Sequence, residues 1–258
     1  MAKPKSASQS APKTAPKTAM VLAAGLATRL RPVSQSRPKA LVEVAGKALI
    51  DHALDRLAEV GVERAVVNTH FLGDQIAAHL AGRKRPAIRI SREETILDTG
   101  GGIARALPLL GPDPFYAVNA KIVWRGGQSE ALRRLAANWD DARMDGLLLL
   151  QPTVSAVGYE GPGDLSMDQF GRLRFREAQE VAPFVYASIQ IIHPRLFEGA
   201  PEGAFPLRPL WERAAAAGRL FGLRHDGEWY HVATPQGLAE AEARLNSAGN
   251  GPVRHGIA

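Results

Sequence analysis

The chain has 258 residues, of which 45% are hydrophobic and 22% are charged, so it is long enough to bury one large core. It has no cysteine, which excludes disulfide bonds, thiol catalysis and cysteine-ligated metal sites. It also has no run of about 18 apolar residues, so we expect no membrane span and no membrane partner. A cysteine-free composition fits a cytoplasmic location.

The positive charge is concentrated near the N-terminus. The formal net charge is +6, and residues 1–18 contain four lysines and no acidic residue. A basic chain suggests a nucleic-acid partner, but the body of this one has no dense basic cluster with interleaved aromatic residues, so we expect no nucleic-acid binding. The composition predicts a disordered basic tail over 1–18 and a loose tail over 247–258. Residues 19–246 would form the folded domain.

Between these tails, short apolar runs that predict strands alternate with segments of helical periodicity. The first half contains predicted strands at 19–24, 64–69, 87–91, 115–119 and 146–151, and predicted helices at 48–60, 74–80, 102–110 and 129–138. This alternation is typical of βαβ units, and it predicts a mostly parallel mixed sheet that helices cover on both faces.

The pattern changes after about residue 158. Glycines break up a hairpin-like stretch over 161–171, and the elements that follow are a strand at 185–192, a helix at 207–217, further strands within 219–232 and a closing helix at 235–247. We therefore divide the domain into a first part, 19–157, and a second part, 158–246.

The loop after the first predicted strand is the most informative segment, and it reads LAAGLATRLRPVSQSRPKALVEV over residues 22–44. In an open α/β sheet, ligands bind beyond the carboxyl ends of the strands. Gly25 would let backbone N–H groups approach a polyphosphate. Arg29 and Lys39 would supply hydrogen-bond donors and positive charge to phosphate oxygens. The alternative is a surface loop whose basic residues face water.

A second glycine-rich segment, ETILDTGGGI over residues 94–103, precedes a predicted helix. Three glycines there predict a helix N-terminus with exposed backbone donors. The alternative is a flexible turn at the start of that helix.

These two segments together resemble a known family. The pattern L-A-A-G-x-x-T-R-L-R-P, followed by R-P-K-A-L-V-E-V-A-G-K-A-L-I, resembles the signature of the sugar-1-phosphate nucleotidyltransferases, or sugar-nucleotide pyrophosphorylases. The T-G-G-G form is similar to that of bacterial N-acetylmuramate 1-phosphate uridylyltransferases, and the resemblance extends over roughly 20–245. It implies a Rossmann-like three-layer α/β/α nucleotidyltransferase fold with a nucleotide-binding half, 19–157, and a sugar-phosphate half, 158–246.

The resemblance also implies a reaction. A nucleoside triphosphate, with UTP preferred, would condense with a sugar 1-phosphate, with N-acetylmuramate 1-phosphate preferred, to give an NDP-sugar and pyrophosphate. These two substrates would be the partners of a monomer or small homo-oligomer that serves peptidoglycan recycling.

By the same resemblance, individual residues take roles. Arg29 and Lys39 would be catalytic, and the nucleotide would be bound by Leu22, Ala23, Ala24, Gly25, Thr28, Thr99, Gly100, Gly101, Gly102 and Asn119. The T-G-G-G segment would read the nucleobase through backbone groups. The acceptor sugar would contact Tyr186, Ala187 and Asp164, although a merely buried strand is the alternative for the apolar residues near 185–192.

The resemblance implies Mg²⁺ as well, which prefers carboxylate ligands. The family places an Asp after the strand that here reads FYAVN, but this chain has Asn119-Ala120-Lys121. His231 is the remaining, weak metal candidate. Three alternatives stay open: the substrate phosphates hold the metal, Lys121 itself serves as the cation, or the chain is a catalytically impaired homologue that binds a nucleotide or sugar nucleotide.

Overall fold

The computed structural model describes residues 15–26, 28–30 and 35–247. Most of the two predicted tails lies outside these residues. Thr18, which was assigned to the N-terminal tail, is the first residue of a strand, and Ser247 is the last residue of a helix. Within the described ranges, no helix has the length and apolar character needed to cross a membrane.

Four parallel strands form the first part of the main sheet. They are β1 (Thr18–Leu22), β4 (Arg64–Thr69), β5 (Ala87–Arg92) and β6 (Phe115–Asn119), in the spatial order β6-β1-β4-β5. The sequences of β1 and β6 are continuous apolar runs because central parallel strands are buried on both faces.

The second part of the sheet is built around an antiparallel strand. β11 (Phe184–Ile192) runs antiparallel to β6 and to β8 (Gly146–Pro152), and β12 (Leu220–Arg224) extends β8 in parallel. The predicted hairpin is present as β9 (Leu165–Met167) and β10 (Leu173–Phe175). The sheet is therefore mixed, as the sequence predicted.

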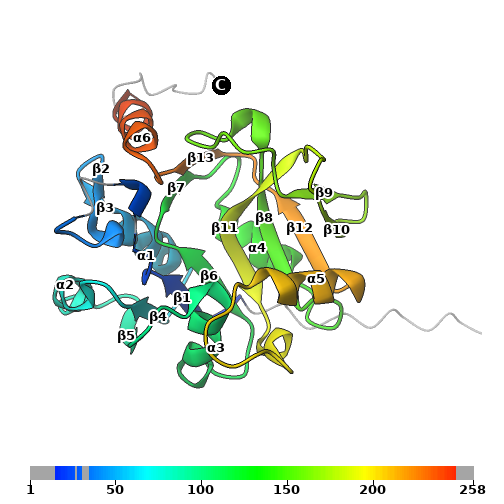
Figure 1. Ribbon diagram of the computed structural model, residues 1–258, viewed down its shortest axis with the longest axis horizontal. Coiled ribbons are helices and arrows are strands. Elements are labelled where there is room, and N and C mark those ends of the chain that lie inside the picture. The colour runs from blue at the N-terminus through cyan, green and yellow to red at the C-terminus, as the bar shows by residue number, and fades with distance from the viewer. Residues whose placement is uncertain (1–14, 27, 31–34, 248–258) are drawn as a thin grey trace, which may run out of the picture.

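Helices cover both faces of this sheet (Figure 1). α1 (Leu49–Glu59), α2 (Gly73–Leu80) and α4 (Ala131–Asn138) contribute to one hydrophobic cluster, whereas α3 (Asp98–Leu110) and α5 (Arg208–Ala216) contribute to another. The two clusters lie on opposite sides of the strands, so the fold has three layers, α/β/α.

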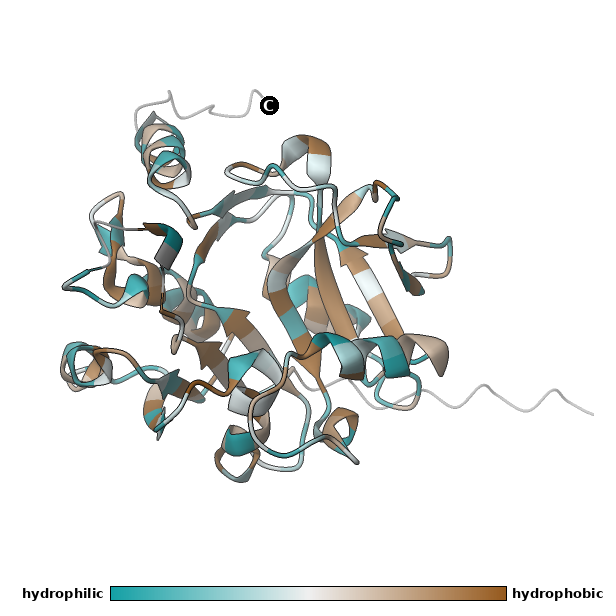
Figure 2. Ribbon diagram, viewed as in Figure 1, coloured by the Kyte–Doolittle hydropathy of each residue, from teal (hydrophilic) through white to brown (hydrophobic). Residues whose placement is uncertain are grey.

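The alternation of side chains along β1 shows how the layers are separated. Ala19 and Val21 pack in the cluster of α1, while Met20, between them, packs in the cluster of α3. Figure 2 shows that the strands of the main sheet are largely brown, whereas teal segments are frequent in the helices and loops around them.

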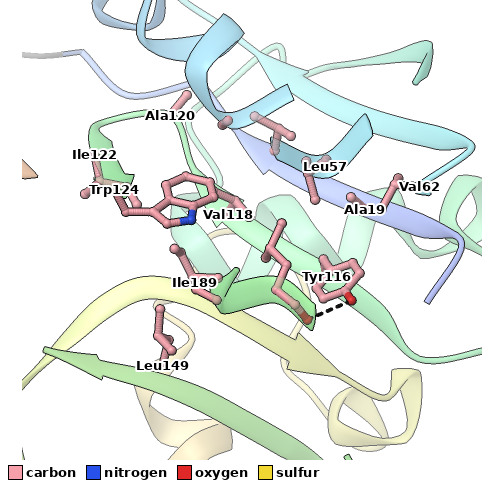
Figure 3. Close-up of a cluster of buried hydrophobic side chains, with 14 of the residues drawn as sticks. Ala19, Leu57, Val62, Tyr116, Val118, Ala120, Ile122, Trp124, Leu149 and Ile189 are labelled. Carbon is pink, nitrogen blue, oxygen red and sulfur yellow. Dashed lines mark hydrogen bonds between the residues drawn. The ribbon is translucent and has the colours of Figure 1, made fainter. Parts of the chain in front are cut away.

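The first of these clusters surrounds the junction of the two parts of the sheet (Figure 3). Tyr116 on β6 packs there with Leu57 and Val62, and its hydroxyl donates a hydrogen bond of 3.1 Å to the carbonyl oxygen of Leu132. The bond satisfies a polar group that would be costly to bury unpaired. Trp124 and Ile189 continue the cluster toward β11.

A smaller ribbon brings the C-terminal segment back to the first part. β7 (Ile122–Arg125) follows β6 after a tight turn and pairs antiparallel with β13 (Glu228–His231), and α6 (Pro235–Ser247) packs beside β13. The sequence analysis did not predict β7. The remaining short elements are the pair β2 (Glu43–Val44) and β3 (Lys47–Ala48) and the 3-10 turns Thr28–Leu30, Lys39–Leu41, Thr153–Ser155 and Pro194–Phe197.

Candidate active site

A cavity opens where the parallel strands end. Leu22 at the end of β1 pairs with Asn68 of β4 on one side and with Asn119 of β6 on the other, so the three loops that follow share one edge of the sheet. The cavity there, which we call the loop cavity, has a volume of about 500 Å³. Its lining residues are Leu22, Ala23, Ala24, Gly25, Leu26, Arg29, Lys39, Ala40, Asn68, Glu93, Ile96, Asp98, Thr99, Asn119, Ala120, Lys121 and Ala233.

A second cavity adjoins the first. Because β11 runs antiparallel to β6 with Ile189 opposite Val118, the middle of β11 lies beside the end of β6. The cavity at this point, which we call the tyrosine cavity, has a volume of about 260 Å³. Its lining residues are Thr99, Asn119, Lys121, Tyr159, Asp164, Val185, Tyr186, Ser188, Pro206, Leu207, Arg208, Trp211, Trp229 and His231. Thr99, Asn119 and Lys121 line both cavities and therefore mark the junction between them.

Two residues that line these cavities have an unusual backbone conformation. Asp98, the first residue of α3, has φ 58°, and Ser188, in the irregular middle of β11, has φ 63°. A positive φ is uncommon outside glycine, and such residues concentrate at functional sites. The irregularity in β11 lies between Tyr186 and Gln190. Such local interruptions of strand pairing change the direction of side chains and are frequent next to active sites.

Three cationic side chains meet at the loop cavity. Arg29 comes from the turn after β1, Lys39 from the turn Lys39–Leu41, and Lys121 from the turn between β6 and β7. Burial, followed by the charges of Lys121 and Arg29, lowers the pKa of Lys39 to about 7. Burial and the charge of Arg29 also lower the pKa of Lys121, while Asp164 opposes the shift. The predicted convergence of Arg29 and Lys39 on one cavity is present in the structure.

His231 lines the tyrosine cavity, close enough to the three cations for their charges to act on it. Its ring stacks on the indole of Trp229, with centroids 5.6 Å apart. Burial, followed by the charges of Lys121, Lys39 and Arg29, lowers the pKa of His231 to about 3. The imidazole is therefore neutral at physiological pH.

The residues at the junction do not fit a metal ion that the protein itself would hold. Within the described ranges, no group of three or more His, Asp or Glu side chains could bind one. Glu93 accepts hydrogen bonds from Asn68 and from the backbone of Leu97. Two further carboxylates line these cavities: Asp98 accepts a hydrogen bond from the backbone N–H of Thr99, and Asp164 lies in the field of the Lys121 ammonium, which would repel a divalent cation. The predicted contribution of His231 to a metal site is therefore not supported.

A buried pair of side chains holds two walls of the loop cavity together. The Asn68 side-chain oxygen accepts a hydrogen bond of 2.7 Å from the backbone of Ala23, and its amide nitrogen donates one of 2.7 Å to Glu93. Glu93 in turn accepts one of 3.1 Å from the backbone of Leu97. Asn68 and Glu93 are 2% and 5% exposed. No local sequence pattern indicates this role of Glu93, because its partner lies 25 residues away in the chain.

The T-G-G-G segment differs from its expected arrangement. α3 begins at Asp98 rather than after the glycines, and the backbone N–H groups of Gly100 and Gly101 donate to the carbonyl oxygen of Phe205. The expectation of exposed donors is therefore wrong for these two residues. None of the three glycines lines a cavity described above; they are Gly100, Gly101 and Gly102.

Steric constraints explain these glycines. A Cβ atom at Gly100 would lie 2.4 Å from the Phe205 ring, and one at Gly102 would lie 2.7 Å from the Glu93 carboxylate. The segment thus packs the helix closely against its neighbours. Thr99 does reach the cavities, although its hydroxyl also accepts a hydrogen bond of 3.0 Å from the backbone of Leu207.

The predicted acceptor residues divide into two groups. Tyr186 and Asp164 both line the tyrosine cavity, and the Tyr186 backbone N–H donates to the Asp164 carboxylate at 3.0 Å. Ala187 is 0% exposed and packs in the core, because alternate residues of β11 face opposite sides. The Ala187 side chain therefore lines neither cavity, and the structure does not support the predicted contact with a substrate. The side chain of Thr28 lies outside what the structure describes.

The chain matches known nucleotide-transferring proteins. A family model described as nucleotidyl transferase matches residues 18–159. N-acetylmuramate alpha-1-phosphate uridylyltransferase of Caulobacter vibrioides is 48% identical over 89% of this chain and 97% of its own length. The protein of the same name from Neisseria meningitidis serogroup B is 31% identical over 87% and 96%. A UDP-glucose pyrophosphorylase solved with UDP-glucose shares the fold, with a TM-score of 0.74 at 16% identity over 90% of this chain and 99% of its own.

Proposed function

The chain belongs to the nucleotidyl transferase family, and from that premise we propose that it transfers the uridylyl group of UTP to the phosphate of N-acetylmuramate α-1-phosphate. The products are a UDP-sugar and pyrophosphate. The Caulobacter and Neisseria relatives support this choice of substrates, because nearly the whole length of each relative aligns with this chain.

The arrangement of the two cavities supports transfer from UTP in one cavity to the acceptor in the other. UTP occupies the loop cavity, where Arg29 and Lys39 contact its phosphates. The acceptor occupies the tyrosine cavity, with its phosphate directed toward the junction. A phosphate oxygen of the acceptor then attacks the α-phosphorus of UTP, and the bond between the α-phosphorus and the bridging oxygen breaks as pyrophosphate leaves with the electron pair. Holding both substrates across one junction lowers the entropic barrier to this step.

The observation that carries the proposal is the meeting of three cationic side chains at the loop cavity, one of which, Lys121, also lines the tyrosine cavity. Both substrates are anionic at the reacting end, and fixed positive charge in a partly buried site offsets their repulsion. The wall of the tyrosine cavity includes two aromatic side chains, Trp211 and Tyr186, which meet edge to face with ring centroids 4.8 Å apart. Such a wall suits the apolar face of a sugar ring.

Pyrophosphate release tests this function. The purified chain is mixed with each of UTP, CTP, GTP and ATP, in combination with N-acetylmuramate, N-acetylglucosamine, glucose and mannose 1-phosphates. We expect release to be fastest with UTP and N-acetylmuramate 1-phosphate, by at least tenfold in kcat/KM over the other pairs. Mass spectrometry of the UDP-sugar confirms the product.

Two results would contradict the proposal. Faster release with another pair would assign a different nucleobase or sugar. UTP binding by calorimetry without release from any pair would favour the alternative, a homologue that binds nucleotides without turnover.

A further inference from the structure

We propose that the Lys121 side chain is a catalytic residue that supplies the positive charge between the two reacting phosphates. This inference rests on the proposed transfer reaction. Lys121 lines both the loop cavity and the tyrosine cavity, whereas Arg29 and Lys39 line only the first of these two. It is therefore the one cation among these three that faces donor and acceptor at once.

The backbone fixes Lys121 at the junction. The turn between β6 and β7 is closed by a hydrogen bond of 2.8 Å from the Lys121 N–H to the Asn119 carbonyl oxygen. The carbonyl oxygen of Lys121 accepts a further bond of 3.1 Å from Val232, which follows β13. Both neighbours in the turn, Asn119 and Ala120, line the loop cavity. These bonds fix the backbone of Lys121, and with it the origin of the side chain, beside the junction.

The electrostatic surroundings of Lys121 call for an anion. Within the described ranges, no carboxylate forms an ion pair with Lys121, Lys39 or Arg29. Among the described residues, the carboxylate whose charge favours the protonated form of Lys121 is that of Asp164, which itself accepts a hydrogen bond from the Tyr186 backbone. Burying like charges together costs free energy unless an anion arrives. Two phosphate groups at the junction would compensate these charges.

The chemistry needs charge at this point. As the acceptor oxygen approaches the α-phosphorus, negative charge gathers on the nonbridging oxygens of the transferred group. An ammonium group beside those oxygens stabilises this state without gaining or losing a proton. Because the residues of the junction do not fit a protein-held divalent cation, the Lys121 ammonium is the positive charge that the chain itself provides there.

Substitution of Lys121 tests the proposal. We expect Lys121→Gln to lower kcat for pyrophosphate release by about 10² to 10³-fold, and Lys121→Arg to keep it within about tenfold of the parent because it preserves the charge. Lys121→Asp is expected to be as impaired as Lys121→Gln at every Mg²⁺ concentration. The control Lys17→Gln removes an exposed lysine that pairs with Glu63 before β1, and should leave kcat unchanged.

A binding measurement separates this proposal from the proposed function. UTP affinity is measured calorimetrically in EDTA, and we expect it to fall about tenfold in Lys121→Gln and to be unchanged in Lys17→Gln. If the parent releases no pyrophosphate from any pair, the transfer reaction is wrong, and this binding difference still decides whether Lys121 contacts phosphate. The proposal is overturned if Lys121→Gln matches the parent in both assays, or if Lys121→Asp with Mg²⁺ is faster than the parent.

Discussion

Two clusters of basic residues in this protein differ in how their charge is compensated. The first cluster lies where β8 and β12 begin. There the Asp145 carboxylate pairs with Arg195 at 2.7 Å and with Arg219 at 2.9 Å, and Arg195 also pairs with Asp141 at 2.9 Å. Burial alone would raise the pKa of Asp145, but the hydrogen bonds from the two arginines outweigh it and hold the pKa below its usual value.

The cavity junction shows the opposite arrangement. There burial and mutual repulsion lower the pKa of Lys39 to about 7, and the described carboxylates form no ion pair with it. One cluster is therefore complete within the fold, whereas on the proposed function a phosphate ligand completes the other. Paired charges contribute to folding, and uncompensated ones are retained at a cost in stability because they serve binding.

Substituting one arginine in each cluster is expected to give the largest difference between an effect on activity and an effect on stability. Arg29→Met should lower kcat/KM by about 10³-fold, or about 4 kcal/mol of transition-state stabilisation, with unfolding free energy unchanged. Arg195→Met should lower the unfolding free energy by about 2 kcal/mol, because Asp145 loses a charged partner, and leave kcat unaltered. Urea unfolding and pyrophosphate release measure the two quantities.

The reverse pattern would remove the distinction between the clusters. If Arg195→Met lost turnover while still folded, or if Arg29→Met remained fully active, the charge at the junction would not be reserved for substrate.

Two glycines allow the same distinction between stability and ligand binding to be tested at backbone positions. A Cβ atom at Gly102 would lie 2.7 Å from Glu93 and 2.8 Å from Asn68, so Gly102→Ala should lower the unfolding free energy by about 2 kcal/mol. A Cβ atom at Gly25 would meet nothing within 4 Å, so Gly25→Ala should fold normally and weaken UTP binding about tenfold. Thermal unfolding and calorimetry distinguish the two variants, and equal losses of stability would contradict this assignment.

A further expected effect is a pH dependence of UTP binding. In the free protein Lys39 has a pKa of about 7, and the triphosphate favours its charged form, so the pKa rises on binding. Affinity should therefore be constant below pH 7 and fall by up to tenfold per pH unit above it. Calorimetry at pH 6.5 and 8.5 in two buffers should show proton uptake at the higher pH.

Lys39→Met controls for this effect. Because its folded pKa lies below its unfolded value, Lys39 lowers stability below pH 7, and this cost disappears as the pH rises from 7 toward 10. The variant should lose the pH dependence of binding and be more stable than the parent at pH 7. An unchanged proton uptake in the variant would assign the titration to another group.

The sequence predicted those parts of the site whose signals are local. β4 at 64–69, β6 at 115–119 and α6 at 235–247 have the predicted bounds, because apolar periodicity marks them. The convergence of Arg29 and Lys39 followed from a motif within one loop. Glu93 and Ser188 were missed because their roles depend on partners and strand register that distant segments supply.

The glycine segment illustrates why the remainder was wrong. Three glycines before a helix are typical both of an anion-binding turn and of close packing, and only the position of Phe205 against Gly100 and Gly101 decides between them. Ala187 likewise belongs to a strand whose register was not predictable, and a shift of one residue exchanges the core face for the cavity face.

The segment from Phe205 to Leu207 has a consequence for substrate selection. Its Phe205 carbonyl holds the start of α3, its Leu207 N–H binds the Thr99 hydroxyl, and Leu207 also lines the tyrosine cavity. A bulkier sugar that pushed Leu207 outward would pull Thr99 away from the loop cavity. On the proposed assignment of the two cavities, we expect acceptor size and nucleotide binding to be coupled, so that a mutation that widens one cavity weakens binding in the other.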